Sequence, residues 1–337
     1  MDWFQQLTGF RELDYRDTRE RLAVEGGQLV SLMNDRRFSV GSFELPSLAE
    51  LRQRVADRRP ERGRLRVRNV VGDVRELHGS DEFRKALFQV ASQFNCLEMI
   101  SPHYTPEDGV TRYQNDHTQG PACAIAAGAA TIFRNYFLSV DGVPGQTRAR
   151  QIDTLADAGD ELARRIGCAR ADLWEMRNGY ALCSIGGLGK IARLLGSSPR
   201  EAREELRGYV RFGIQSDTEV TGVDAPPGQT VSQIFCSALP VAYSDVPSYH
   251  WDDFALFVLE AAYEATLHAA LLNGEAGGSE RVLLTRLGGG AFGNHASVID
   301  RAMSGALERF RGHALDVVIV SHGRAPASML ELEEAFR

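Results

Sequence analysis

The sequence predicts a three-layer α/β/α fold around a mixed sheet. Short runs of β-branched and other apolar residues alternate with helical stretches over most of the 337 residues. Apolar residues make up 43% of the chain and charged residues 25%, which is typical of a soluble globular protein. Alternating strands and helices build a sheet covered on both faces, and such sheets bind ligands at the loops beyond the carboxyl ends of their strands.

The first 62 residues are expected to form a peripheral helical extension. Leu48, Leu51 and Val55 recur at helical spacing. They follow Ser47, a residue type that favours the start of a helix. We therefore place residues 1–62 outside the main domain.

The remaining residues, 63–337, are expected to form one domain with a helical insertion at about 138–228. Before the insertion, two apolar runs predict strands and a run of small residues predicts a tightly packed helix. After it, strand and helix alternate again. The predicted strands lie within residues 65–74, 86–95, 178–185, 231–243, 282–287 and 315–322, and the predicted helices within 121–137, 153–165, 199–212, 252–272 and 295–310.

Charge and cysteine content exclude several classes of function. The formal net charge of −7 gives no general attraction to nucleic acid or to anionic membranes. No signal peptide and no apolar run of membrane-spanning length is visible. The five cysteines are odd in number and none forms a C-x-x-C pair, which argues against a disulfide framework or a thiolate zinc site. We expect a cytoplasmic protein, or one delivered into a host cytoplasm.

The most informative stretch is VLLTRLGGGAFGN, in which a buried strand runs into a glycine-rich loop and then a helix. Glycines at 288, 289, 290 and 293 let backbone N–H groups approach a ligand, and the helix start beyond them favours an anion. Together they predict a diphosphate cradle, with a plain turn as the alternative. Phe292 within the loop could stack on a ribose or pack on the adjacent helix.

The order of these features resembles the macrodomain family. VVGDV (70–74) and FQVASQFN (88–95) are similar to the first strands of macrodomains, HTQGPACAIAAGA (117–129) to their first ligand loop, and 230–303 to their second half. Within this family the chain looks most like the MavL-like arginine-specific ADP-ribosylhydrolase branch, on the basis of FNCLE, TQGPACA, RNYF and LGGGAFGN. This branch is distantly similar to poly(ADP-ribose) glycohydrolases. The first loop lacks the usual glycine run and the paired glutamates of those glycohydrolases.

This resemblance implies a set of ligand contacts. Asp73 would accept from the adenine amino group, although a turn-forming Asp after Gly72 is the alternative. Asn95 would bond the distal ribose. Asp116 and His117 could touch the ribose or the leaving arginine, and His117 could equally be an exposed loop histidine. The remaining implied contacts are Gln119, Gly120 and Ala122 in the first loop, and Gly289, Gly290, Ala291, Phe292, Gly293 and Asn294 around the diphosphate and ribose.

Removal of ADP-ribose from arginine, including arginine on ubiquitin, is the activity that the resemblance implies. Such a hydrolysis needs a positioned water and carboxylates beside the distal ribose. Asp245, Asp252, Asp253 and Glu264 are the catalytic candidates, because they fall in one loop and the helix after it. Asp252 and Asp253 are equally typical of a helix start, and Glu260 is expected to be solvated.

Other residues rank lower. Glu219 could recognise the modified protein, while Tyr249 and Trp251 could flank the scissile bond or pack in the core. No histidine pattern of a metal site occurs, so the expected reaction uses neither metal nor cofactor. The expected partners are ADP-ribose and an ADP-ribosylated protein. The alternatives are a non-catalytic ADP-ribose reader and an enzyme like the poly(ADP-ribose) glycohydrolases.

Overall fold

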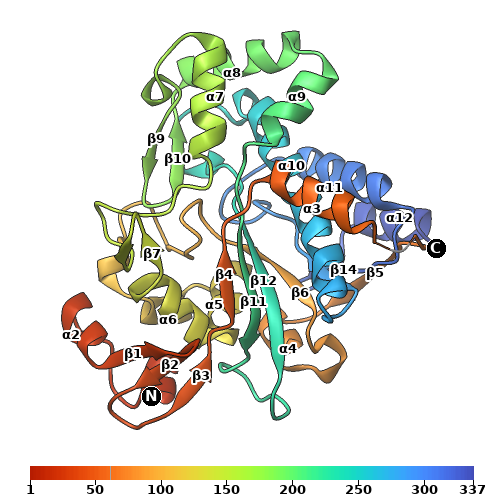
Figure 1. Ribbon diagram of the computed structural model, residues 1–337. Helices are drawn as coiled ribbons and strands as arrows, with labels where there is room; N and C mark the ends of the chain where they lie inside the picture. Colours follow the sequence, from red (N-terminus) through yellow and green to blue (C-terminus); the bar gives the residue numbers. More distant parts are fainter. Residues whose placement is uncertain (61) are drawn as a thin grey trace.

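The computed structural model describes residues 1–60 and 62–337. Its centre is a seven-stranded sheet in the order β4-β11-β12-β6-β13-β14-β5 (Figure 1). Neighbours from β12 to β5 are parallel, whereas β11 and β4 are antiparallel. The strands are β4 (Ser42–Glu44), β5 (Arg66–Val71), β6 (Leu87–Ala91), β11 (Gly213–Glu219), β12 (Thr230–Cys236), β13 (Arg281–Leu284) and β14 (Asp316–Ser321).

Helices cover both faces of this sheet, because side chains alternate between two apolar cores. In β14, Val317 and Ile319 pack into one core and Val318 into the other. One face carries α3 (Leu48–Arg58), α10 (Asp252–Glu275) and α11 (Ala296–Phe310), and the other α4 (Val74–Gly79), α5 (Gln119–Ala126) and α6 (Gly128–Tyr136). The last helix, α12 (Ala327–Ala335), packs beside β5. The three-layer fold expected from the sequence is confirmed.

The first residues are not the helical extension expected from the sequence. Besides α1 (Trp3–Thr8) and α2 (Tyr15–Glu20), they form an antiparallel sheet of β1 (Leu22–Glu25), β2 (Gln28–Ser31) and β3 (Arg37–Ser39). Gly26 and Gly27 both have positive φ, so they close a two-residue hairpin turn, which the helical interpretation missed. The predicted helix after Ser47 is confirmed as α3, with a capping box between Ser47 and Glu50.

The inserted segment is shorter than expected. β11 lies within 138–228, yet it pairs with β12 in the central sheet, so the insertion ends before Gly213. Polar residues over 215–217 hid this strand from the apolar pattern. The insertion contains β7 (Ser139–Val140), β8 (Val143–Pro144), α7 (Ala156–Ile166), β9 (Trp174–Arg177), β10 (Tyr180–Cys183), α8 (Ile185–Ser197) and α9 (Arg200–Arg207).

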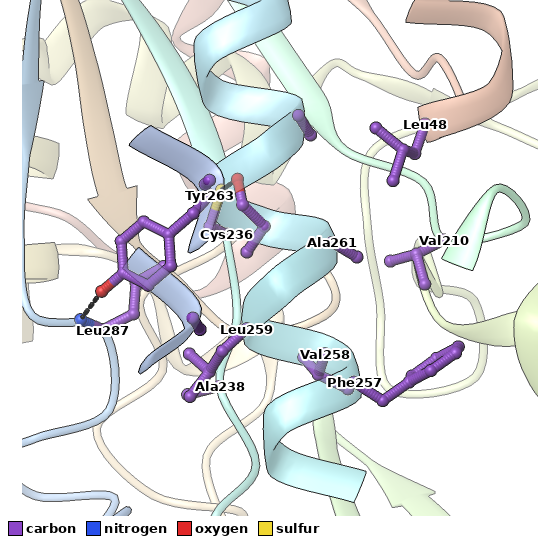
Figure 2. Close-up of a cluster of buried hydrophobic side chains, with 14 of the residues drawn as sticks. Leu48, Val210, Cys236, Ala238, Phe257, Val258, Leu259, Ala261, Tyr263 and Leu287 are labelled. Carbon is purple, nitrogen blue, oxygen red and sulfur yellow. Dashed lines mark hydrogen bonds between the residues drawn. The ribbon is translucent and has the colours of Figure 1, made fainter. Parts of the chain in front are cut away.

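α10 is the central core helix. Figure 2 shows its side chains among those of neighbouring segments, and the Tyr263 hydroxyl accepts from the Leu287 N–H at 3.0 Å. The same hydroxyl donates to the Thr285 carbonyl at 2.8 Å, so the helix holds the chain just before the glycine loop. Its length and hydropathy are also those of a membrane span, contrary to the expectation that no such stretch exists, and 78% of that apolar window is buried in the structure.

Candidate functional site

A cleft runs along the carboxyl edge of the parallel strands. It consists of two adjoining cavities, the Asp73 cavity of about 450 Å³ and the glycine-loop cavity of about 300 Å³. Thr285 follows β13 and His322 follows β14, and both residues line both cavities. Asp116, His117, Thr118 and Gln119 are also shared by the two cavities. The cleft therefore lies where open α/β sheets bind ligands.

The glycine loop forms one wall of the cleft. Gly288 has a φ of 73°, and a Cβ there would meet the Asn294 side chain at 2.5 Å, so this position requires glycine. Asn294 holds the loop in shape, because its side-chain amide donates to the carbonyls of Leu239 and Gly288. Gly290, Ala291 and Phe292 line the cavity, whereas Gly289, Gly293 and Asn294 are outside its lining.

The first ligand loop lies opposite and is fixed to β6. The Gln119 side chain accepts from the Ala91 N–H and donates to the Gln89 carbonyl, both at 2.8 Å. A Cβ on Gly120 would lie 1.9 Å from the Ala91 carbonyl oxygen, so only glycine fits against the strand. Gln119 and Gly120 line the glycine-loop cavity, and Ala122 lines the Asp73 cavity.

Asp73 lies at the far end of the cleft, after β5. Its carboxylate accepts from the Arg75 N–H at 2.8 Å at the start of α4, and the residue also lines the Asp73 cavity. Asp73 therefore both caps the start of α4 and lines the cavity. Asn95 lies elsewhere, because its buried amide bonds Gln151 and the Leu97 N–H and is not part of the cleft lining.

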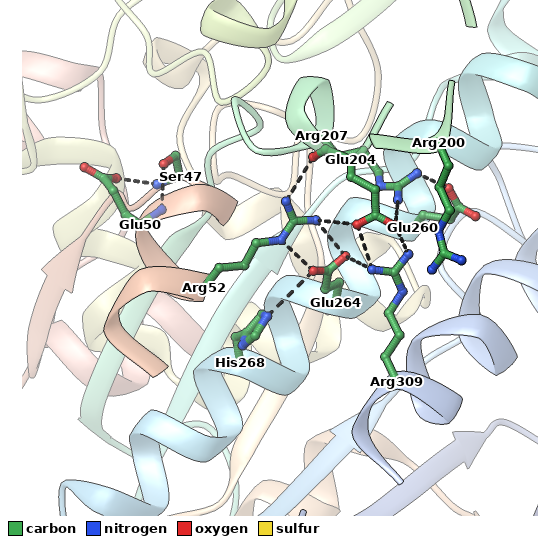
Figure 3. Close-up of polar contacts among 10 residues, drawn as sticks. All are labelled: Ser47, Glu50, Arg52, Arg200, Glu204, Arg207, Glu260, Glu264, His268 and Arg309. Carbon is green, nitrogen blue, oxygen red and sulfur yellow. Dashed lines mark hydrogen bonds and ion pairs between the residues drawn. The ribbon is translucent and has the colours of Figure 1, made fainter. Parts of the chain in front are cut away.

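The four candidate acids do not converge on the cleft. Glu264 is buried against Arg52 and Arg309 in an ion-pair cluster between α3, α10 and α11 (Figure 3). Asp252 accepts from His295 at 2.8 Å. Asp245 and Asp253 are exposed, and Asp245 follows the cleft residue Tyr243 by two positions. Spacing along one helix could not show which face of α10 meets a pocket.

Three of the lower-ranked residues also lie outside the cleft lining. Glu219 ends β11 and accepts from the Ser39 N–H at 2.8 Å. Trp251 is fully buried in the core, as its alternative interpretation had it, and Tyr249 is exposed. Glu260, expected to be solvated, is only partly exposed and pairs with Arg207.

Glu98, which no sequence pattern singled out, lies in the wall of the glycine-loop cavity. Cys96 has a φ of 59°, in the left-handed region, and turns the chain just before it. Glu98 is 1% exposed, and its Oε1 lies 3.4 Å from the Arg134 guanidinium. Its Oε2 is buried with no hydrogen-bond partner among the described residues.

Burial raises the pKa of Glu98 to about 7, although the charge and hydrogen bond of Arg134 act in the opposite direction. Arg134 is itself fully buried, with its guanidinium 3.9 Å from the centre of the Phe235 ring. One arginine at 3.4 Å does not offset the loss of water around this carboxyl group. A carboxyl group that titrates near neutral pH suits proton transfer.

Aromatic side chains close the glycine-loop cavity. The Phe292 ring lies 5.4 Å from that of Tyr180 and 5.6 Å from that of Tyr243. Tyr180 belongs to β10, so the insertion contributes directly to the cleft wall. The three rings come from three separate segments and offer flat apolar surface to a sugar or a base.

No group of three or more His, Cys, Asp or Glu side chains gathers as a metal site within residues 1–60 and 62–337. The five cysteines are all free, and four of them are buried. The carboxyl and imidazole side chains that line the glycine-loop cavity are those of Glu98, Asp116, His117 and His322.

Comparison with known proteins gives remote likenesses only. No protein-family model matches the chain, and no curated protein matches it. The chain is similar to poly(ADP-ribose) glycohydrolase from Deinococcus radiodurans in complex with ADP-ribose, with 12% identity over 87% of this chain and 93% of that one and a TM-score of 0.45. The enzyme from Thermomonospora curvata is similar at 14% identity over 96% and 95% of the two chains, with a TM-score of 0.45.

Proposed function

We propose that the chain binds ADP-ribose in the cleft and hydrolyses the glycosidic bond that links ADP-ribose to a protein. The observation that carries this proposal is a single cleft with Asp73 at one end, a glycine loop along its wall and the buried Glu98 carboxyl group near its aromatic end. The two adjoining cavities, of about 450 and 300 Å³, together suit an extended ligand. The solved structures to which the chain is similar are of poly(ADP-ribose) glycohydrolases, several of them in complex with ADP-ribose.

Each part of the cleft has a role in this proposal. Asp73 accepts from the adenine amino group, and backbone N–H groups around Gly290 bond the diphosphate. Phe292 and its aromatic neighbours stack on the terminal ribose. Glu98 in its protonated form donates to the departing group, and its carboxylate then activates the attacking water.

Arginine is the attachment residue that we propose, on a protein partner such as ubiquitin. Asp245 and Asp253 are exposed beyond the cleft residue Tyr243, where they can face the guanidinium of a modified protein. The reaction as proposed uses no metal or cofactor and takes place in the cytoplasm. Release of ADP-ribose from arginine-linked substrate, with no release from serine- or glutamate-linked substrate, is the expected result. Equal release from all three would overturn the arginine assignment.

A reader of ADP-ribose without catalysis is the second candidate. It is favoured by one observation, namely that Asp252 and Glu264 are engaged in bonds away from the cleft. A reader would bind ADP-ribose and release none from any of the three substrates. Replacement of Glu98 by Gln would then leave both results unchanged.

A further inference from the structure

Ser248, His295 and Asp252 form a hydrogen-bonded chain at the start of α10 and α11. His295 Nε2 lies 3.0 Å from Ser248 Oγ, and His295 Nδ1 lies 2.8 Å from Asp252 Oδ1. A carboxylate can only accept, so Nδ1 carries the proton and Nε2 of the neutral ring accepts from the serine hydroxyl. This is the order nucleophile, base and orienting acid that activates serine in hydrolases.

Helix capping does not explain these contacts. Asp252 opens α10, but no side-chain cap is present at that helix, and its carboxylate is directed to His295 instead. Ser248 likewise makes no cap at the 3-10 turn η6 (Ser248–His250), and His295 makes none at α11. Ser248 and Asp252, residue types that commonly cap helices, instead form hydrogen bonds with the imidazole ring of His295.

The three groups are reachable from solvent. Trp251 is fully buried, and its indole N–H donates to the Val246 carbonyl at 3.4 Å, which anchors the segment. The side chains of His295 and Asp252 are 41% and 42% exposed, and Ser248 is not buried. The Tyr249 N–H directly follows the serine along the chain. The residue after a nucleophile commonly supplies an oxyanion donor.

We infer that this trio is a second hydrolytic site, for carboxylic esters. Ser248 Oγ attacks the ester carbonyl while its proton passes to His295 Nε2. The bond to the alcohol then breaks, and His295 returns the proton to the departing oxygen. Water then gives a proton to the same ring and attacks the acyl-serine, and the ring returns that proton to Ser248 Oγ as the carboxylic acid is released. Because the site is open, an ester carried on a larger molecule reaches it without entering the cleft.

A fluorophosphonate probe on the full chain tests this assignment. The expected result is one covalent adduct, mapped to Ser248 by peptide mass, together with hydrolysis of p-nitrophenyl acetate. Ser248→Ala loses both. His295→Gln and Asp252→Asn lower the labelling rate by about 100-fold or more. Ser244→Ala is the matched control, because this nearby hydroxyl only accepts from the Val246 N–H, and it keeps the wild-type rate.

Absence of an adduct on Ser248, or equal ester hydrolysis by wild type and Ser248→Ala, overturns the assignment. Thermal melting of every variant separates lost chemistry from lost folding. Binding of ADP-ribose is measured on the same samples, so that failure of this site is distinguished from failure of the cleft.

Discussion

Glu98 and Glu264 are both buried carboxyl groups beside arginine, yet their surroundings differ sharply. Glu264 bonds Arg52 at 2.7 and 3.0 Å, with Arg309 at 3.6 Å and His268 at 3.7 Å (Figure 3). Burial alone would raise the pKa of Glu264, but these partners outweigh it and lower the pKa to about 2. Glu98 has one arginine at 3.4 Å, and its pKa is about 7.

The comparison shows that the number of cationic partners and the geometry of their bonds decide whether a buried glutamate stays ionised. Around Glu264 the charges are matched, so the carboxylate stays ionised and fastens α3 and α11 to α10. One oxygen of Glu98 has no hydrogen-bond partner among the described residues, and the pKa of about 7 lets this carboxyl group gain or lose its proton near neutral pH. The first arrangement stabilises the fold, and the second suits chemistry.

Removing Glu264 should cause the largest loss of stability. Glu264→Ala removes the buried carboxylate that Arg52 bonds through two nitrogens and leaves Arg52 and Arg309 paired with Glu204, and loss of such a buried partner typically costs about 3–5 kcal/mol. Urea denaturation measures this loss. Glu308→Ala is the control, because its pair with Arg311 is half exposed and should contribute less than about 1 kcal/mol. Equal losses in the two variants would contradict a fastening role for Glu264.

Glu98 should make stability depend on pH. A carboxyl group whose pKa is raised from 4.5 to about 7 on folding gives its full stability below pH 4.5, and this stability is lost as the pH rises through 7. The loss amounts to about 3 kcal/mol for a shift of this size. The Glu98→Gln variant lacks this titration. The unfolding free energy of the variant minus that of the wild type should therefore rise from pH 5 to pH 8. A constant difference would contradict the raised pKa.

Catalysis should be sensitive to the same substitution. Glu98→Gln keeps an amide beside Arg134 but cannot transfer a proton, so kcat should fall by about 100-fold. Binding of ADP-ribose should stay within a few-fold of wild type. Release of ADP-ribose from arginine-linked substrate, followed as a pH profile, measures the effect. An unchanged kcat and pH profile would remove Glu98 from the reaction.

Replacement of Arg309 in the ion-pair cluster by lysine should have the smallest effect on stability. Arg309 bonds Glu204 through two nitrogens and lowers the pKa of Glu204 to about 2. Lysine keeps the charge but cannot make both bonds, so Arg309→Lys should cost about 1 kcal/mol in urea denaturation. Hydrolysis should not change. A larger effect on activity than on stability would show that the cluster communicates with the cleft.

Much of the fold could be predicted from local pattern. The buried strands β13 and β14, the capped helix α3 and the glycine loop are all visible as runs of apolar residues, a serine cap or a glycine cluster. The strand β11 was missed because polar residues interrupt it, and the hairpin of β1 and β2 because Gly26-Gly27 was not recognised as its turn.

The candidate site was harder to predict, since its chemistry depends on long-range contacts. Asp73 and Phe292 carry local signals and do line the cleft. Glu98 carries none, because its partner Arg134 lies 36 residues away and its burial appears only in the fold. Glu264 was expected to be catalytic, but its partner Arg52 lies 212 residues away along the chain and holds it outside the cleft.

The central claim is that the cleft holds ADP-ribose, and calorimetric titration of ADP-ribose tests it most directly. A Cβ on Gly290 would meet no atom within 4 Å, so Gly290→Leu should fill the cleft without straining the fold. Gly196→Leu is the control, because its Cβ is equally free on α8. The account predicts binding to one site in wild type and Gly196→Leu, and loss of binding in Gly290→Leu. Absence of binding to the wild type, or equal binding by all three proteins, would contradict it.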